Sequence, residues 1–103
     1  MRLRDLYSFK FGDWIDIVRE IGEDLVAKYK EYLAECIGVA VGELREKVEE
    51  LSESDFEFLA NCQNTAESDA WGWANRNWGW RVGRTVWDEV EKYFRERRYE
   101  LGI

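Results

Sequence analysis

The stretch from Trp71 to Arg84 constrains the fold most, because its aromatic residues repeat every seven positions. It reads WGWANRN followed by WGWRVGR, and the third place of each block is continued by Trp87 and Phe94. Seven residues are close to two turns of an α-helix, so equivalent positions of successive blocks share one helical face. We therefore predict a single amphipathic helix over residues 66–99, with a wide apolar face and a polar back.

Three glycines, Gly72, Gly79 and Gly83, fall on one stripe of that predicted helix. A glycine costs about 1 kcal/mol against alanine inside a helix, so three on one stripe suggest close packing. Our interpretation is a tight crossing with another helix, framed by core tryptophans. The alternatives are a slot for a flat ligand and contact with a second copy of the chain. A strand, with Trp71 and Trp73 alternating around Gly72, is less favoured because the period of seven continues beyond it.

The sequence also predicts helices in the rest of the chain. Apolar residues recur at three- and four-residue steps through residues 13–37, which predicts a long amphipathic helix. The apolar stripe changes direction between Gly38 and Gly42, where we predict a break. Shorter helices are predicted over residues 43–51 and 54–63.

Two local signals set the remaining boundaries. Ser54 with Glu57 three residues later fits a capping box at the start of the third helix. The segment 64–69, NTAESD, is interpreted as a loop or capping segment, and residues 1–12 as an extended arm. The complete expectation is an all-α bundle of about four helices, forming one domain over residues 1–103. The predicted helices cover residues 13–37, 43–51, 54–63 and 66–99.

Residue usage excludes several chemistries. The chain has no histidine, which removes the commonest general base and the commonest transition-metal ligand. Its two cysteines, Cys36 and Cys62, are too few for a zinc site. They are most simply buried thiols, although a disulfide is also compatible with their positions. No phosphate loop, dinucleotide fingerprint or calcium loop is present, so we expect no enzyme, no cofactor and no metal.

The location is inferred from what the sequence lacks. No run of apolar residues approaches the length of a membrane span. Charged residues occupy the beginning of the chain, where a signal peptide has its apolar block. We therefore expect a cytoplasmic protein without a membrane partner.

Charge is distributed unevenly along the chain. Residues 1–70 hold 17 acidic and 8 basic side chains, whereas residues 71–103 hold 5 acidic and 7 basic ones. The helix predicted at 13–37 carries much of this acid within an arc of roughly 120°. Such a stripe either keeps the helix solvated or contacts basic groups of a partner. As candidate partner-binding residues we take Asp16, Glu20, Glu23, Asp24 and Glu31.

A second candidate site combines aromatic and cationic side chains. Indole rings stack on bases and sugars, and arginines hold phosphates, so the tryptophan blocks could bind a flat ligand or single-stranded nucleic acid. The residues of this alternative site are Trp71, Trp73, Arg76, Trp78 and Trp80. The formal net charge of −7 disfavours nucleic acid as a direct partner of the whole molecule.

The preferred hypothesis is a small, acidic, non-catalytic protein-binding module. It would present an acidic helical face, from the helices predicted at 13–37 and 43–51, to a basic protein, such as one that binds nucleic acid. Immunity proteins, antitoxins and phage-encoded inhibitors that imitate nucleic acid share this combination of small size and acidic surface, and the analogy extends no further. The alternatives are ligand binding through residues 71–84 and a homodimer through the face of Gly72, Gly79 and Gly83.

Overall fold

The computed structural model describes residues 11–79 and 81–103, with side chains from residue 15 onward. These residues form four α-helices and one short 3-10 helix, which confirms the predicted all-α bundle. In chain order the elements are α2 (Phe11–Ile37), η1 (Val41–Glu43), α3 (Leu44–Ser54), α4 (Phe56–Trp78) and α5 (Arg84–Leu101). The arm predicted over residues 1–12 falls mostly outside the described residues.

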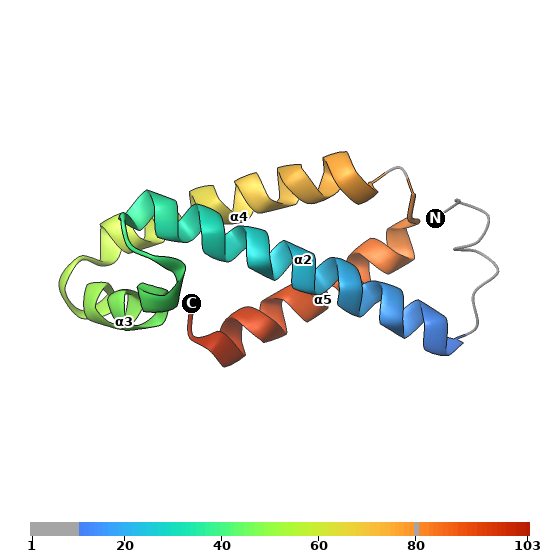
Figure 1. Ribbon diagram of the computed structural model, residues 1–103, viewed down its shortest axis with the longest axis horizontal. Helices are drawn as coiled ribbons and strands as arrows, with labels where there is room; N and C mark the ends of the chain where they lie inside the picture. The colour runs from blue at the N-terminus through green and yellow to red at the C-terminus, as the bar shows by residue number, and fades with distance from the viewer. Residues whose placement is uncertain (1–10, 80) are drawn as a thin grey trace.

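Helix α2 is the central element of the bundle. Both α4 and α5 pack on it, and Figure 1 shows them diverging from their connection, with α5 crossing behind α2. Its inward face buries Ile21, Leu25, Tyr29 and Leu33 completely. Burying such side chains contributes about 1.5–3 kcal/mol each, so α2 supplies much of the stabilising core.

The break predicted between Gly38 and Gly42 is confirmed. Helix α2 ends at Ile37, and Gly38 takes the left-handed conformation (φ 89°) that closes helices with little cost for glycine. The Gly38 and Val39 amides both donate to the Ala34 carbonyl, which satisfies one of the last four carbonyls of the helix. The second helix was predicted over residues 43–51 and is observed as α3, Leu44–Ser54.

The prediction of one helix over residues 66–99 was wrong. Helix α4 ends at Trp78, a turn follows, and Gly83 is the extended N-cap residue from which α5 starts. The ring centroids of Trp71 and Trp87 lie 5.5 Å apart. In one straight helix these residues would be separated by about 24 Å, so the contact itself requires that the chain reverse its direction between them. Two glycines within five residues make this the weakest helical segment, and the chain reverses there.

The loop predicted over residues 64–69, between helices at 54–63 and 66–99, was also wrong. A single residue, Asp55, separates α3 from α4. Its side chain accepts a hydrogen bond from the Phe58 amide, so the N-cap of α4 is Asp55 and not Ser54. The helix then continues through residues 64–69 without interruption. Tertiary packing overrides the weak local helix preference there, because Ala66 and Ala70 are buried in the core.

Close packing of α4 uses alanines in place of the predicted glycine stripe. Ala66, Ala70 and Ala74 recur at four-residue steps and are each at most 1% exposed. They form one face of α4, the helix that packs most extensively on α2. A tight glycine contact does exist, but on α2: a methyl group at Gly22 would lie 2.3 Å from Cδ1 of Tyr93 on α5.

Candidate protein-binding face

All five residues of the predicted acidic site are exposed on α2. They lie on the side of the helix opposite its fully buried residues Ile21, Leu25 and Tyr29. The five are Asp16, Glu20, Glu23, Asp24 and Glu31. The structure therefore places the predicted residues together on one accessible face, which the 3.6-residue period already implied.

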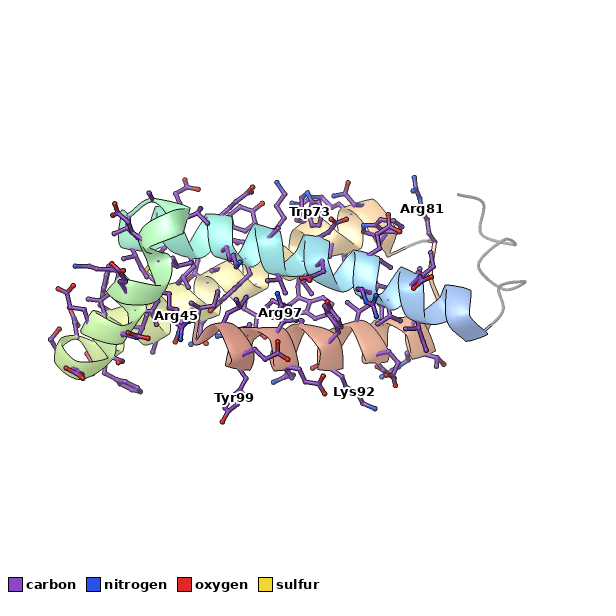
Figure 2. All side chains as sticks on the ribbon, turned by 60° about the horizontal axis from the view of Figure 1, so that its bottom comes forward. Arg45, Trp73, Arg81, Lys92, Arg97 and Tyr99 are labelled. Atoms are coloured by element: carbon purple, nitrogen blue, oxygen red, sulfur yellow. A yellow bond between two sulfur atoms is a disulfide. The ribbon has the colours of Figure 1, made fainter. Side chains whose placement is uncertain are left out.

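Two of these carboxylates are neutralised within the chain. Glu31 Oε2 lies 3.1 Å from Lys28 Nζ, one turn earlier on α2. Glu23 Oε2 lies 3.5 Å from Arg97 Nε, and Figure 2 shows Arg97 extending from α5 toward α2. The Glu23 carboxylate also raises the pKa of Tyr93, although partial burial of that phenol is the larger cause. Glu23 thus contributes to the α2–α5 contact and is less available to a partner.

The other three carboxylates form a row without neutralising bases. Asp16, Glu20 and Asp24 follow one another at four-residue steps, about 6 Å apart along the helix axis. Among residues 15–79 and 81–103, none of the three makes an ion pair. We call this set the acidic row.

On α3 and α5, several acids have a basic partner on the same helix. The pairs are Arg45–Glu49 and Lys47–Glu50 on α3, and Lys92–Glu89, Arg95–Glu91 and Arg97–Glu100 on α5. Such exposed pairs are worth only about 0.3–0.5 kcal/mol each, but they reduce the local negative potential. The acidic row is therefore a place where negative charge stays concentrated.

The alternative tryptophan site is not assembled on one surface. The Trp71 ring packs against Trp87 and Phe94 between α4 and α5, and it is half-buried. Trp73 points elsewhere, with Lys28 Nζ of α2 lying 5.3 Å from its ring centroid (Figure 2). Trp71 and Trp73 therefore take part in different helix contacts, and both rings already have partners within the protein.

The remaining residues of that alternative site are also separated. The Arg81 guanidinium lies 5.9 Å from the Trp78 ring centroid, at the turn that follows α4. Arg76 is exposed on α4, and Trp80 lies outside the described residues. The sequence predicted a continuous aromatic slot only because it placed these residues on one uninterrupted helix.

The structure separates the three glycines that were proposed to form a homodimer face. Gly72 lies on α4, where an added methyl group would meet only Arg76 Nη1, at 3.4 Å. Gly79 and Gly83 instead flank the turn between α4 and α5. The three glycines do not form a stripe, and self-association remains a prediction without a defined surface.

The two cysteines are joined as a disulfide, Cys36–Cys62, between the end of α2 and the second turn of α4. The simplest expectation, two buried thiols, was wrong. Cys62 is 2% exposed, but Cys36 lies on the exposed side of the last turn of α2. Their positions on different helices could not establish pairing from sequence, because it depends on how α2 and α4 cross.

A buried hydrogen-bond network at the end of α5 had no signal in the sequence. The Tyr29 hydroxyl donates to the main-chain oxygen of Ile103 over 2.7 Å, and the Gln63 side-chain amide donates to the same oxygen over 2.9 Å. The Arg98 guanidinium lies 4.4 Å from the Tyr29 ring centroid and bonds Glu67 at 2.9 Å. Burial raises the pKa of Tyr29 to about 12. Partners up to 74 residues apart in the chain meet here, which local patterns do not encode.

The groove beside this network has a volume of about 500 Å³ and is open to solvent. Its walls include Gln63, Arg95, Arg98 and Tyr99, but both arginines already bind carboxylates of the chain, Glu91 and Glu67. In the described part of the chain, no group of three or more histidine, cysteine or acidic side chains is placed to hold a metal ion. None of the described helices has the length and apolarity needed to cross a membrane.

Comparisons with protein-family models, with curated proteins and with solved structures found no match. We therefore base the assignment of a function on the acidic row of α2.

Proposed function

We propose that this chain is a non-catalytic protein-binding module whose contact surface is the acidic row of α2. The proposed partner is a basic protein, such as one that binds nucleic acid, and the outcome of binding is inhibition or antagonism. The observation that carries this proposal is the unneutralised series Asp16, Glu20, Asp24. A row of carboxylates about 6 Å apart on a rigid helix offers regularly spaced acceptors to lysines and arginines.

The acidic row is unfavourable for the isolated fold. Glu20 has like-charged neighbours four residues before and after it, Asp16 and Asp24. Each such pair destabilises a helix by about 0.2–0.5 kcal/mol. A lysine at position 20 would exchange two repulsive pairs for two attractive ones. We expect Glu20→Lys to raise the free energy of unfolding by about 1 kcal/mol, measured by urea unfolding.

The same substitution is the test of function, because its effects on stability and on binding have opposite signs. Tagged wild-type chain should retain basic proteins from the lysate of its source cells at about 0.1 M salt, and release them near 1 M, where the Debye length is only about 3 Å. Glu20→Lys should lose these partners although it is folded more stably. Impaired binding by an unfolded variant is thereby excluded.

The matched control is Glu96→Lys on α5. Glu96 is also exposed and makes no ion pair with described residues, so the change in net charge is the same. If Glu96→Lys reduces binding as much as Glu20→Lys does, only the total charge matters and the acidic row is not the site. If Glu20→Lys keeps every partner, α2 is a solvated face and the proposal is wrong.

Ligand binding through residues 71–84 has less support. Trp71 is occupied by Trp87 and Phe94, and Trp73 by Lys28, so a flat ligand would have to displace contacts of the protein itself. Titrating oligonucleotides and flat cofactors while following tryptophan fluorescence separates the two proposals. Saturable quenching would favour the tryptophans over the acidic row.

The cytoplasmic location predicted from the sequence stays a proposal, and the disulfide argues against it. Disulfides persist in oxidising compartments and are rare where glutathione and thioredoxin keep thiols reduced. Alkylating intact cells before lysis and mapping Cys36 and Cys62 would decide the matter. A bonded pair in vivo would favour an oxidising compartment for this chain.

A further inference from the structure

The Cys36–Cys62 disulfide encloses one end of the bundle. The two cysteines are 26 positions apart, and the closed loop contains η1, α3 and the first turns of α4. Figure 1 shows η1 and α3 at one end of the bundle, beside the last turns of α2 and the first turns of α4, and we call η1, α3 and these first turns of α4 the lobe. A crosslink at the neck of such a lobe limits how far its two ends can separate.

The lobe has few other attachments. Helix α3 buries Leu44, Val48 and Leu51, packs mainly on α4 and has few contacts with α2 or α5. Both of its ion pairs, Arg45–Glu49 and Lys47–Glu50, join residues of α3 itself. Segments with few buried apolar contacts open more readily than the core around them.

The first turns of α4 are also weakly anchored in the core. Phe56 is 72% exposed and Phe58 40% exposed, so before Cys62 only Leu59 is a buried anchor of α4. Beyond Cys62 the helix is anchored by Ala66, Ala70 and Ala74. The disulfide therefore lies at the boundary between a weakly and a strongly anchored part of α4.

The two cysteine residues differ in exposure. Cys36 is exposed in the last turn of α2, whereas Cys62 is 2% exposed. A thiolate of an external dithiol reductant would attack Sγ of Cys36 and break the Sγ–Sγ bond. Cys62 leaves as a thiolate and takes up a proton, and the second thiol of the reductant then releases Cys36 as a thiol with oxidation of the reductant to its disulfide.

We propose that this disulfide is a redox-operated latch. When it is formed, α3 and the first turns of α4 are held against the end of α2. When a dithiol reduces it, this lobe opens while the body built by α2, the rest of α4 and α5 stays folded. The latch is independent of the acidic row, so either proposal can fail without the other.

Hydrogen exchange on the full chain tests the latch, with and without dithiothreitol under native conditions. Amides of residues 44–62 should exchange roughly tenfold faster or more after reduction, whereas those of residues 66–78 and of the middle of α2 should change little. Equal protection of residues 44–62 in both states would overturn the proposal. A uniform loss of protection in all helices would also overturn it, because the bond would then hold the whole fold.

Two further measurements keep the test decisive. Cys36→Ser should reproduce the reduced pattern without reductant, since the exposed position tolerates serine without a buried cavity. Glutathione should form its mixed disulfide on Cys36 and not on Cys62, as read by peptide mapping of the acid-quenched protein. A purified chain whose mass shows both thiols free after air oxidation would refute the latch.

Discussion

The contact of Gly22 with Tyr93 allows a sharp test of how α5 packs on α2. A methyl group added at Gly22 would lie 2.3 Å from Cδ1 and 2.9 Å from both Cγ and Cε1 of Tyr93. Carbon atoms prefer separations of about 3.5–4.0 Å, so the ring must move by more than about 1 Å. Because Cγ is the inner end of the ring, the movement requires a change of χ1 or a shift of α5.

The expected magnitude of Gly22→Ala combines two opposing effects. Alanine favours the helix by about 1 kcal/mol. Overpacking of this kind costs about 1–3 kcal/mol. The net change is a loss of up to about 2 kcal/mol in the free energy of unfolding. For a domain of this size, each kcal/mol corresponds to roughly 4–8 °C in Tm.

Gly72→Ala is the matched control on α4. Its methyl group would meet only Arg76 Nη1 at 3.4 Å, the mobile end of an exposed side chain. Without a steric cost, the higher helix propensity of alanine should stabilise the fold by about 1 kcal/mol. Thermal unfolding followed by circular dichroism should therefore rank Gly72→Ala first, wild type second and Gly22→Ala last.

The reasoning would be refuted if Gly22→Ala were as stable as Gly72→Ala, because the close approach of α2 and α5 would then be absent. A double-mutant cycle with Tyr93→Ala checks the cause. Removing the ring should remove the steric cost of Gly22→Ala, with a coupling of about 0.5–3 kcal/mol between the two sites. If the effects of the two substitutions on stability simply added, the loss of stability in Gly22→Ala would not come from the Tyr93 ring.

Two further predictions concern the core. Ala70→Leu should destabilise the fold by about 1–3 kcal/mol in urea unfolding, because Ala70 is fully buried and has no room for a larger side chain. The control Ala27→Leu, on the exposed face of α2, should change stability by less than about 0.5 kcal/mol. Tyr29 is uncharged below its pKa, which burial raises to about 12 in the folded state, while an unfolded tyrosine ionises near pH 10. The contribution of Tyr29 to the free energy of unfolding should be complete below about pH 10 and be lost as the pH rises toward 12. Tyr29→Phe should therefore flatten the fall in stability between these two pH values. Below that range, the variant should be about 1 kcal/mol less stable than the wild type, because the hydrogen bond to Ile103 is lost.

Local sequence was sufficient to predict α2 and the position of its C-terminal end. The apolar steps through residues 13–37 specify one buried stripe, and Gly38 supplies the left-handed residue that terminates the helix. The same stripe places Asp16, Glu20 and Asp24 on the opposite face, so the candidate site was predictable from the helical period alone. Which acids are neutralised was only partly predictable, since Lys28 is one turn from Glu31 but Arg97 reaches Glu23 from another helix.

Only the tertiary structure decided how the second half of the chain is arranged. Aromatics seven residues apart suit one long helix, and they equally suit two antiparallel helices in which Trp71 meets Trp87. The choice depends on whether reversing at Gly79–Gly83 buries more surface on α2 than continuing would. That comparison involves contacts such as Tyr29 with Phe94, which are distant in the chain and come together only when the bundle closes.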